Sequence, residues 1–194
     1  MDNRKELTRQ LIMQSFKEIM LRKPFDKISV ANITEEAGIR RPSFYNHFQD
    51  KYELLEYIVT NEVILPAEQI FMLEDLEHAL YFVIDQMLQD REFYTRAFGV
   101  VGQNGFEDAF VRQFSTMLMR HLVPGDENLP GILSVSQIAH FFASCFVSAA
   151  RSWLQSGQEA TARELTDAYL SLTGHVRLPD GEHLLVQQLN IEIK

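Results

Sequence analysis

Side chains suited to reading a nucleic acid gather within one short stretch of the chain. Arginine can donate two hydrogen bonds to guanine, and asparagine can pair in a similar two-pronged way with adenine. Serine, tyrosine and histidine suit phosphate oxygens, which position a protein on DNA without specifying a sequence. These residue types fall on or beside one predicted helix, at Arg40, Arg41, Ser43, Tyr45, Asn46 and His47. Lys51 starts the next helix, where its charge and the open helix N–H groups could meet a phosphate.

The short helix that would carry these groups also has an apolar side. Pro42 suits its first turn, because the missing N–H of proline is not needed there. Phe44 and Phe48 are four residues apart and therefore share one face. We expect these two rings to pin the helix to a core, which would leave the opposite face free for DNA.

Helical patterns precede this segment. An i, i+4 stripe between Leu7 and Met20 predicts a first helix, which should end before Pro24 because the residue preceding proline disfavours the α region. Ser29 can cap a second, short helix, and we expect it to serve mainly as a cap while it can also touch DNA. Gly38 should end that helix, since glycine takes the left-handed conformation without a Cβ penalty.

A fourth, longer helix is predicted after Asp50, which can cap it. Two short helices joined by a tight turn, with further helices packed beneath them, form the helix-turn-helix arrangement. In this arrangement the second helix lies in the major groove and the first braces it. The sequence therefore predicts binding to double-stranded DNA.

The stretch from Arg41 to Leu55, RPSFYNHFQDKYELL, resembles the signature of the TetR family. That signature has a small residue, a bulky apolar residue, tyrosine, any residue, an aromatic and phenylalanine, and then lysine before a leucine pair. The segment from Ile28 to Ile39 is similar to the helix and turn that precede the signature. The resemblance covers about residues 5–60, and it extends over two consecutive helices.

This resemblance implies a homodimer that binds operator DNA, with a C-terminal helical domain that senses a ligand or a partner. Carried over by position, the residues that contact phosphates are Ser43, Tyr45, His47 and Lys51. Those that face bases are Arg40, Arg41, Pro42 and Asn46. His47 stands where the family also often has tyrosine, so the family's role carries over to His47 less directly than to the other residues.

The rest of the chain also has helical spacing, so the expected fold is all-α. We expect a helix-turn-helix domain over residues 1–50 and a sensing and dimerisation domain over residues 51–194. The further helices are predicted at 67–89 with a break near Glu74–Asp75, 91–102, 105–122, 133–156 and 159–173. Pro66 should kink or interrupt the helix after Leu65, and Asn104–Gly105 and Pro124–Gly125–Asp126 indicate turns. Residues 175–194 fit a strand, a short helix or a loose tail.

Two features of the second half bear on partners. The helices near 133–156 and 159–173 could form a four-helix dimer interface, with an apolar strip that includes small residues: Ile138, Phe142, Cys145, Ala149 and Ser152 or Trp153. Many aromatic residues at helical spacing should form core, although some could line a cavity for a small apolar or aromatic ligand. The chain also resembles a TetR subgroup that includes activators of dihydroxyacetone kinase operons, in segments 91–94, 102–106 and 141–157. A member of that subgroup would respond to a partner protein.

Charge, cysteine content and missing motifs narrow the classes of protein to which this chain could belong. Residues 1–51 hold ten Lys/Arg against seven Asp/Glu, whereas residues 52–194 hold eight against twenty, so the basic end is the one suited to a polyanion. One cysteine excludes an internal disulfide, and the histidines lack metal-ligand spacing. We find no secretory signal, no membrane-length apolar run and no catalytic grouping. We therefore predict a cytoplasmic transcription regulator with no cofactor and no metal. It would act as a repressor or, alternatively, as an activator governed by a partner protein.

Overall fold

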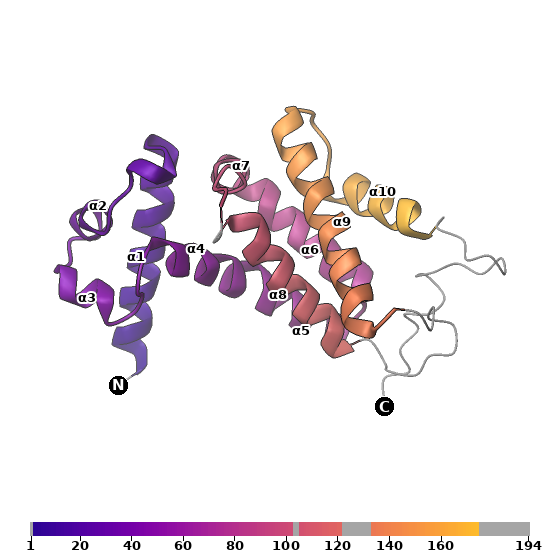
Figure 1. The fold of residues 1–194 in the computed structure, drawn as a ribbon, viewed down its shortest axis with the longest axis horizontal. Helices are drawn as coiled ribbons and strands as arrows, with labels where there is room; N and C mark the ends of the chain where they lie inside the picture. Colours follow the sequence, from indigo (N-terminus) through magenta and orange to yellow (C-terminus); the bar gives the residue numbers. More distant parts are fainter. Residues whose placement is uncertain (1, 103–104, 122–132, 175–194) are drawn as a thin grey trace.

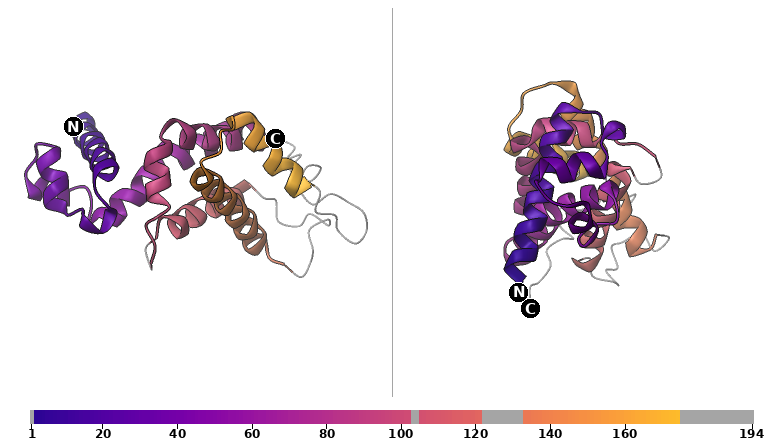
Figure 2. Two further views of the ribbon diagram at one scale, coloured as in Figure 1. Left: turned by 90° about the horizontal axis from the view of Figure 1, so that it is seen from above. Right: turned by 90° about the vertical axis from the view of Figure 1, so that its left-hand side faces the viewer.

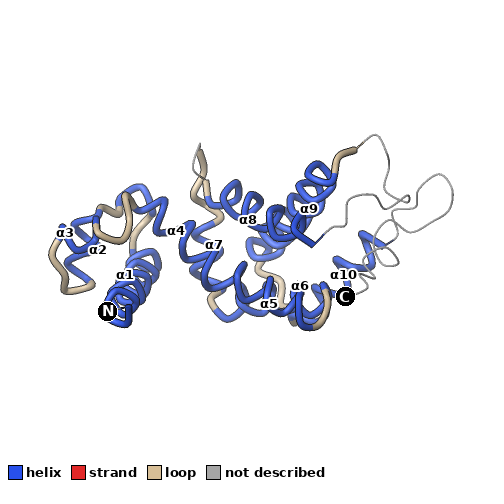
Figure 3. The backbone as a smooth tube through the Cα atoms, turned by 90° about the horizontal axis from the view of Figure 1, so that it is seen from below, coloured by secondary structure: helices blue, strands red, loops and turns tan. Residues whose placement is uncertain are grey.

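The computed structural model describes residues 2–102, 105–121 and 133–174, and within these ranges every regular element is a helix. The predicted all-α class is therefore confirmed, as the tube in Figure 3 shows. The predicted turn at Pro124–Gly125–Asp126, Asn104 and the three alternatives for residues 175–194 lie outside the described residues. No helix within the described part of the chain is both long and apolar enough to cross a membrane.

The chain forms two lobes, and one helix runs from the first into the second (Figures 1 and 2). The first lobe, here called the head, contains α1 (Asp2–Arg22), η1 (Phe25–Lys27), α2 (Val30–Glu36) and α3 (Arg41–Tyr45). The second lobe, here called the body, contains α5 (Leu65–Leu73), α6 (Leu76–Gln89), α7 (Arg91–Ala97), α8 (Phe106–His121), α9 (Val135–Ser156) and α10 (Ala162–Gly174). Helix α4 (Lys51–Val59) leaves the head and continues through the π-helical turn η2 (Thr60–Ile64) into the body.

The junction between α4 and α5 differs from the prediction in where the helix is interrupted and by what kind of turn. Pro66 lies in the first turn of α5, where its missing N–H is tolerated, and the helix is interrupted just before it rather than after Leu65. The interruption is the wider turn η2, in which the Leu65 N–H donates to the Thr60 carbonyl five residues earlier. A π turn often marks a functional site within a helix.

The helix ends in the body follow local sequence signals. The predicted break near Glu74–Asp75 is confirmed, because the Asp75 carboxylate accepts a hydrogen bond from the His78 N–H and so caps α6. The predicted helix at 91–102 ends earlier, at Ala97. Turn-type hydrogen bonds follow it, and Gly102 adopts a positive φ of 113°.

Aromatic side chains form much of the body's core, as predicted for most of them. Phe106 and Phe110 of α8 and Phe146 of α9 are at most 2% exposed. Phe114 bridges the two helices, with its ring centroid 4.9 Å from that of Phe146, and Phe146 in turn meets Tyr169 of α10 at 5.2 Å. These contacts join α8, α9 and α10 around one apolar centre.

The apolar strip predicted on α9 is wrong in two positions. Ile138 and Phe142 are 4% and 5% exposed, because they face the core of their own chain. Phe141, beside Phe142, is 52% exposed instead, and Ala149 lies on an exposed part of the same helix. Cys145 is partly buried between the two faces. Since α9 carries apolar residues on both sides, the helical spacing of those residues alone did not identify the side that faces the core.

Candidate nucleic-acid interface

Helix α2, which precedes α3 in the chain, begins with a complete N-terminal cap. The Ser29 hydroxyl accepts a hydrogen bond from the Asn32 N–H at 3.2 Å, and the Asn32 side chain accepts one from the Ser29 N–H at 3.1 Å. This reciprocal capping box satisfies two N–H groups that a helix start leaves open. Ser29 thus has the capping role expected of it, and its side chain remains exposed on the head's surface.

Gly38 makes the turn between α2 and α3. Its φ of 62° lies in the left-handed region, and the following Ile39 N–H donates to the Thr34 carbonyl. A residue with a Cβ would be strained in this conformation. The chain can then start α3 at Arg41, with Pro42 in its first turn, as the sequence predicted.

Two phenylalanine rings hold α3 in place. Phe44 and Phe48 are 0% and 2% exposed, and their ring centroids are 5.8 Å apart. The Phe48 ring also meets Tyr57 of α4 edge-on at 5.2 Å. The predicted anchoring of α3 to a core is therefore confirmed.

The opposite side of α3 is open. The predicted contact residues on it are exposed, apart from the partly exposed Ser43; they are Arg40, Arg41, Pro42, Tyr45 and Asn46. The Arg41 guanidinium lies 5.9 Å from the centroid of the Tyr45 ring, and one of its N–H groups is 3.4 Å from the Tyr45 hydroxyl. An aromatic ring can orient a nearby arginine in this way without neutralising its charge. The face therefore presents hydrogen-bond donors, and no carboxylate in the described ranges pairs with them.

Lys51 has partners within the head. Its ammonium donates hydrogen bonds to the carbonyls of Phe25 and Ile28 at 2.7 and 2.9 Å, and it lies 4.3 Å from the centroid of the Phe25 ring. Burial lowers the pKa of Lys51, although Asp26 and Asp50 act in the opposite direction. Two of its three N–H groups thus link α4 to the segment just before α2, and they compete with the predicted phosphate contact.

His47 is half-buried and turned toward α1. Its Nδ1 is buried and has no hydrogen-bond partner in the part of the chain that the structure describes. Burial lowers the pKa of His47, and the positive charges of Arg9 and Lys5 lower it further. Arg9 and Lys5 are basic residues that the motif did not include. Only the fold could bring them to this place, because some forty residues separate them from His47 in the chain.

Comparisons with known proteins agree with this geometry. A family model described as "Bacterial regulatory proteins, tetR family" matches residues 12–58, and one described as "Transcriptional regulator C-terminal region" matches residues 74–173. The chain belongs to the TetR family. The family is one of bacterial regulatory proteins, and the family resemblance expected from residues 41–55 is confirmed.

The curated relatives include the HTH-type dhaKLM operon transcriptional activator DhaS of Lactococcus lactis subsp. lactis, which is 33% identical over 115 residues. The match spans 58% of this chain and 59% of that relative's length. This likeness supports the resemblance to the activator subgroup. The domain boundary predicted between residues 50 and 51 stays a prediction, since the two family models leave residues 59–73 unmatched.

Solved structures share the TetR fold. A structure of dihydroxyacetone kinase operon activator DhaS superposes with a TM-score of 0.58 at 24% identity, covering 85% of this chain and 93% of that one. NalD, the secondary repressor of the MexAB-OprM multidrug efflux pump in Pseudomonas aeruginosa, superposes with a TM-score of 0.61 at 22% identity, covering 86% and 94%. At these identities the likeness concerns the fold alone.

Proposed function

We propose that this regulator acts in the cytoplasm as a homodimer that binds double-stranded operator DNA through the open face of α3. The observation that carries the proposal is the division of α3 into two sides. Phe44 and Phe48 are buried beneath it, whereas Arg41, Tyr45 and Asn46 are exposed above it. A short helix held in this way can enter a major groove with its donors already in place.

The proposed contacts divide into two kinds. Arg40, Arg41, Pro42 and Asn46 face base edges, where arginine and asparagine discriminate between base pairs. Ser43, Tyr45 and His47 meet phosphates, and the exposed Ser29 at the start of α2 adds a contact beside them. For Lys51 we propose a supporting role, because its ammonium holds the carbonyls of Phe25 and Ile28 in the segment that leads to Ser29.

For the dimer we propose an interface formed by α9 and α10. Phe141 of α9 and Leu172 of α10 are large apolar side chains that are 52% and 73% exposed, so each could be covered by a second copy. Ala149 and Ala168 are small exposed residues on the same two helices, and small residues allow close helix packing. Two copies joined here would form a four-helix interface and present two α3 helices to one palindrome.

Control of DNA binding would pass from the body to the head through α4. The Glu56 carboxylate of α4 accepts hydrogen bonds from Arg112 and Gln113 of α8 at 3.1 and 2.8 Å. A signal that shifts α8 would therefore shift α4 and change the spacing of the two heads. A ligand or partner has this effect only if it binds one spacing better than the other.

The sign of regulation has two candidates. A dimer bound across a promoter would act as a repressor, which is our main proposal. The similarity to DhaS, an operon activator, favours the second candidate, an activator that responds to a partner protein rather than to a small ligand. A reporter gene behind the operator separates the two, since deletion of the regulator raises expression in the first case and lowers it in the second.

The direct test is selection of a binding site from a pool of random DNA duplexes. We expect an enriched palindrome with half-sites about one helical turn apart, or a multiple of that distance. Footprinting on the DNA upstream of the regulator's own gene should then protect a matching site. A pool that remains random after repeated selection would contradict the proposal.

A further inference from the structure

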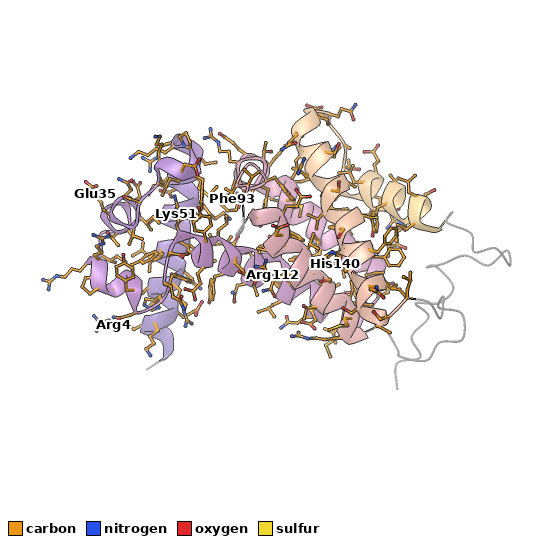
Figure 4. The ribbon with its side chains drawn as sticks, viewed as in Figure 1. Arg4, Glu35, Lys51, Phe93, Arg112 and His140 are labelled. Carbon is orange, nitrogen blue, oxygen red and sulfur yellow. The ribbon has the colours of Figure 1, made fainter. Side chains whose placement is uncertain are left out.

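The N-terminal part of α1 lies beside His47, which follows the C-terminal end of α3. Figure 4 labels Arg4 near the free end of α1, on the side of the head where α3 lies. Lys5 and Arg9 are close enough to lower the pKa of His47 by their charge, with Glu6 as the opposing carboxylate. The start of α1 and the segment that follows α3 are thus neighbours.

Two buried nitrogen atoms in this place lack an acceptor or donor within the described part of the protein. They are Nε of Arg9 and Nδ1 of His47. The Arg9 guanidinium reaches Glu6 only at 3.5 Å and lies 5.7 Å from the centroid of the Tyr57 ring. Buried polar groups are normally hydrogen-bonded, so each such exception requires an explanation. The Arg9 charge is thus weakly paired in the free protein, and since the side chain as a whole is 37% exposed, an oxyanion can approach it from solvent.

The charge around these atoms favours an anion. Lys5 and Arg4 are exposed, and neither has an ion-pair partner among the side chains that the structure describes. Of the carboxylates whose positions the structure describes, Glu6 is the one that acts on His47 together with Arg9 and Lys5. Because the surface is continuous with the exposed face of α3, a duplex lying on α3 would bring its phosphate backbone toward it.

We propose that Lys5 and Arg9 of α1 bind a phosphate of the same duplex, next to His47, so that the DNA-binding surface extends from α3 onto α1. This inference rests on the proposed function, because it takes the duplex on α3 as given. The contact is sequence-independent, since a phosphate is present at every step of the backbone. It therefore adds affinity and fixes the register of the head without changing which operator is preferred.

The test measures the salt dependence of DNA binding by the full-length protein. The probes are the duplex selected with the unmodified protein and an unrelated duplex of equal length. Each phosphate-contacting cation contributes about 0.9 to the slope of log Kobs against log salt concentration on B-DNA. We expect Lys5→Gln and Arg9→Gln each to make this slope shallower by about that amount. Affinity should fall by the same factor on both duplexes.

Two further variants serve as controls. Arg163→Gln removes a cation from the exposed surface of α10, far from the head in Figure 1, and should leave the slope unchanged. Arg9→Lys keeps the charge next to His47 and should retain most of the slope. Because Lys5 is exposed, Lys5→Gln should keep the melting temperature of the unmodified protein, so this variant decides the test even if Arg9→Gln is unstable.

The possible results separate the two proposals. Unchanged slopes for both Lys5→Gln and Arg9→Gln, in a protein that binds its selected duplex, would overturn the phosphate site while leaving the role of α3 intact. A loss of affinity on the selected duplex alone would also overturn it, because a phosphate contact does not discriminate between sequences. Failure of the unmodified protein to bind any duplex would instead refute the proposed function itself.

Discussion

The ammonium of Lys17 in α1 lies 2.8 Å from the carboxylate of Glu62 in η2, and it also pairs with Asp90 at the start of α7. The same ammonium is 5.1 Å from the centroid of the Phe93 ring. Nearby, the Arg96 guanidinium of α7 donates to the Met20 carbonyl at the end of α1. The head is therefore held to the body by α1 as well as by α4.

Replacing Lys17 with methionine should loosen this attachment. Burial by itself would lower the pKa of Lys17, but the hydrogen bonds that its ammonium donates to Asp90 and Glu62 raise the pKa above its usual value of 10.5, so the amine stays charged throughout the neutral range. The variant leaves two carboxylates close together, and we expect a loss of about 1–2 kcal/mol of unfolding free energy. For a chain of this size that loss lowers the melting temperature by roughly 2–8 °C.

A matched control for Lys17→Met is Arg163→Met, which breaks an exposed ion pair with Glu77 on the body. Exposed pairs contribute little, so its melting temperature should barely change. Since Lys17 has a raised pKa, its contribution should persist across neutral pH and disappear only as the pH rises above about 10.5. Equal melting temperatures for the two variants would contradict the structural role of Lys17.

Substitutions on α3 should separate base contacts from phosphate contacts. Arg41→Ala should weaken binding to the selected duplex by about 1–3 kcal/mol, or roughly 5- to 150-fold, and change unrelated duplexes far less. Tyr45→Ala should weaken both duplexes by a similar factor. Fluorescence anisotropy with the two duplexes measures both effects. If both variants bind like the unmodified protein, α3 does not present this face to DNA.

Lys51 gives a case in which the motif and the fold suggest different roles. Lys51→Met removes two hydrogen bonds to backbone carbonyls, so we expect a lower melting temperature, by roughly 2–8 °C for a loss of about 1–2 kcal/mol. Weaker DNA binding should follow with an unchanged salt slope. An unchanged melting temperature with a shallower slope would instead show that Lys51 contacts a phosphate, as the family resemblance implies.

These residues also show what the sequence can predict. The spacing of Phe44 and Phe48 placed both rings on one helical face, and that local geometry was enough to identify the open face opposite. The partners of Lys51 and His47 depend on where η1 and α1 lie in three dimensions, and no spacing within residues 40–51 contains that information. The same limit explains Ile138 and Phe142 on α9. Apolar residues occur on both sides of that helix, and only packing decides which side faces inward.

The dimer interface can be tested at Phe141. Phe141→Arg places a charge on an exposed apolar position of α9, so the fold should survive while association is lost. We expect a shift from dimer to monomer in sedimentation at micromolar concentration, and a marked loss of affinity for the palindrome. Leu73→Arg, at an 82% exposed position on the corner between α5 and α6, is the matched control. A dimeric Phe141→Arg protein would contradict an interface centred on this residue.

The pH dependence of DNA binding provides an independent view of His47. In the free protein burial lowers its pKa, and Arg9 and Lys5 lower it further against the opposing effect of Glu6. A phosphate brought next to the ring would favour the protonated form and raise that pKa in the complex. The complex then binds more protons than the free protein, so affinity should increase as the pH falls from 8 toward 6.

The exchange of one proton limits the change in affinity to about tenfold per pH unit. His47→Gln should remove this component while retaining a polar side chain, and equal pH profiles for the two proteins would show that no phosphate lies beside His47.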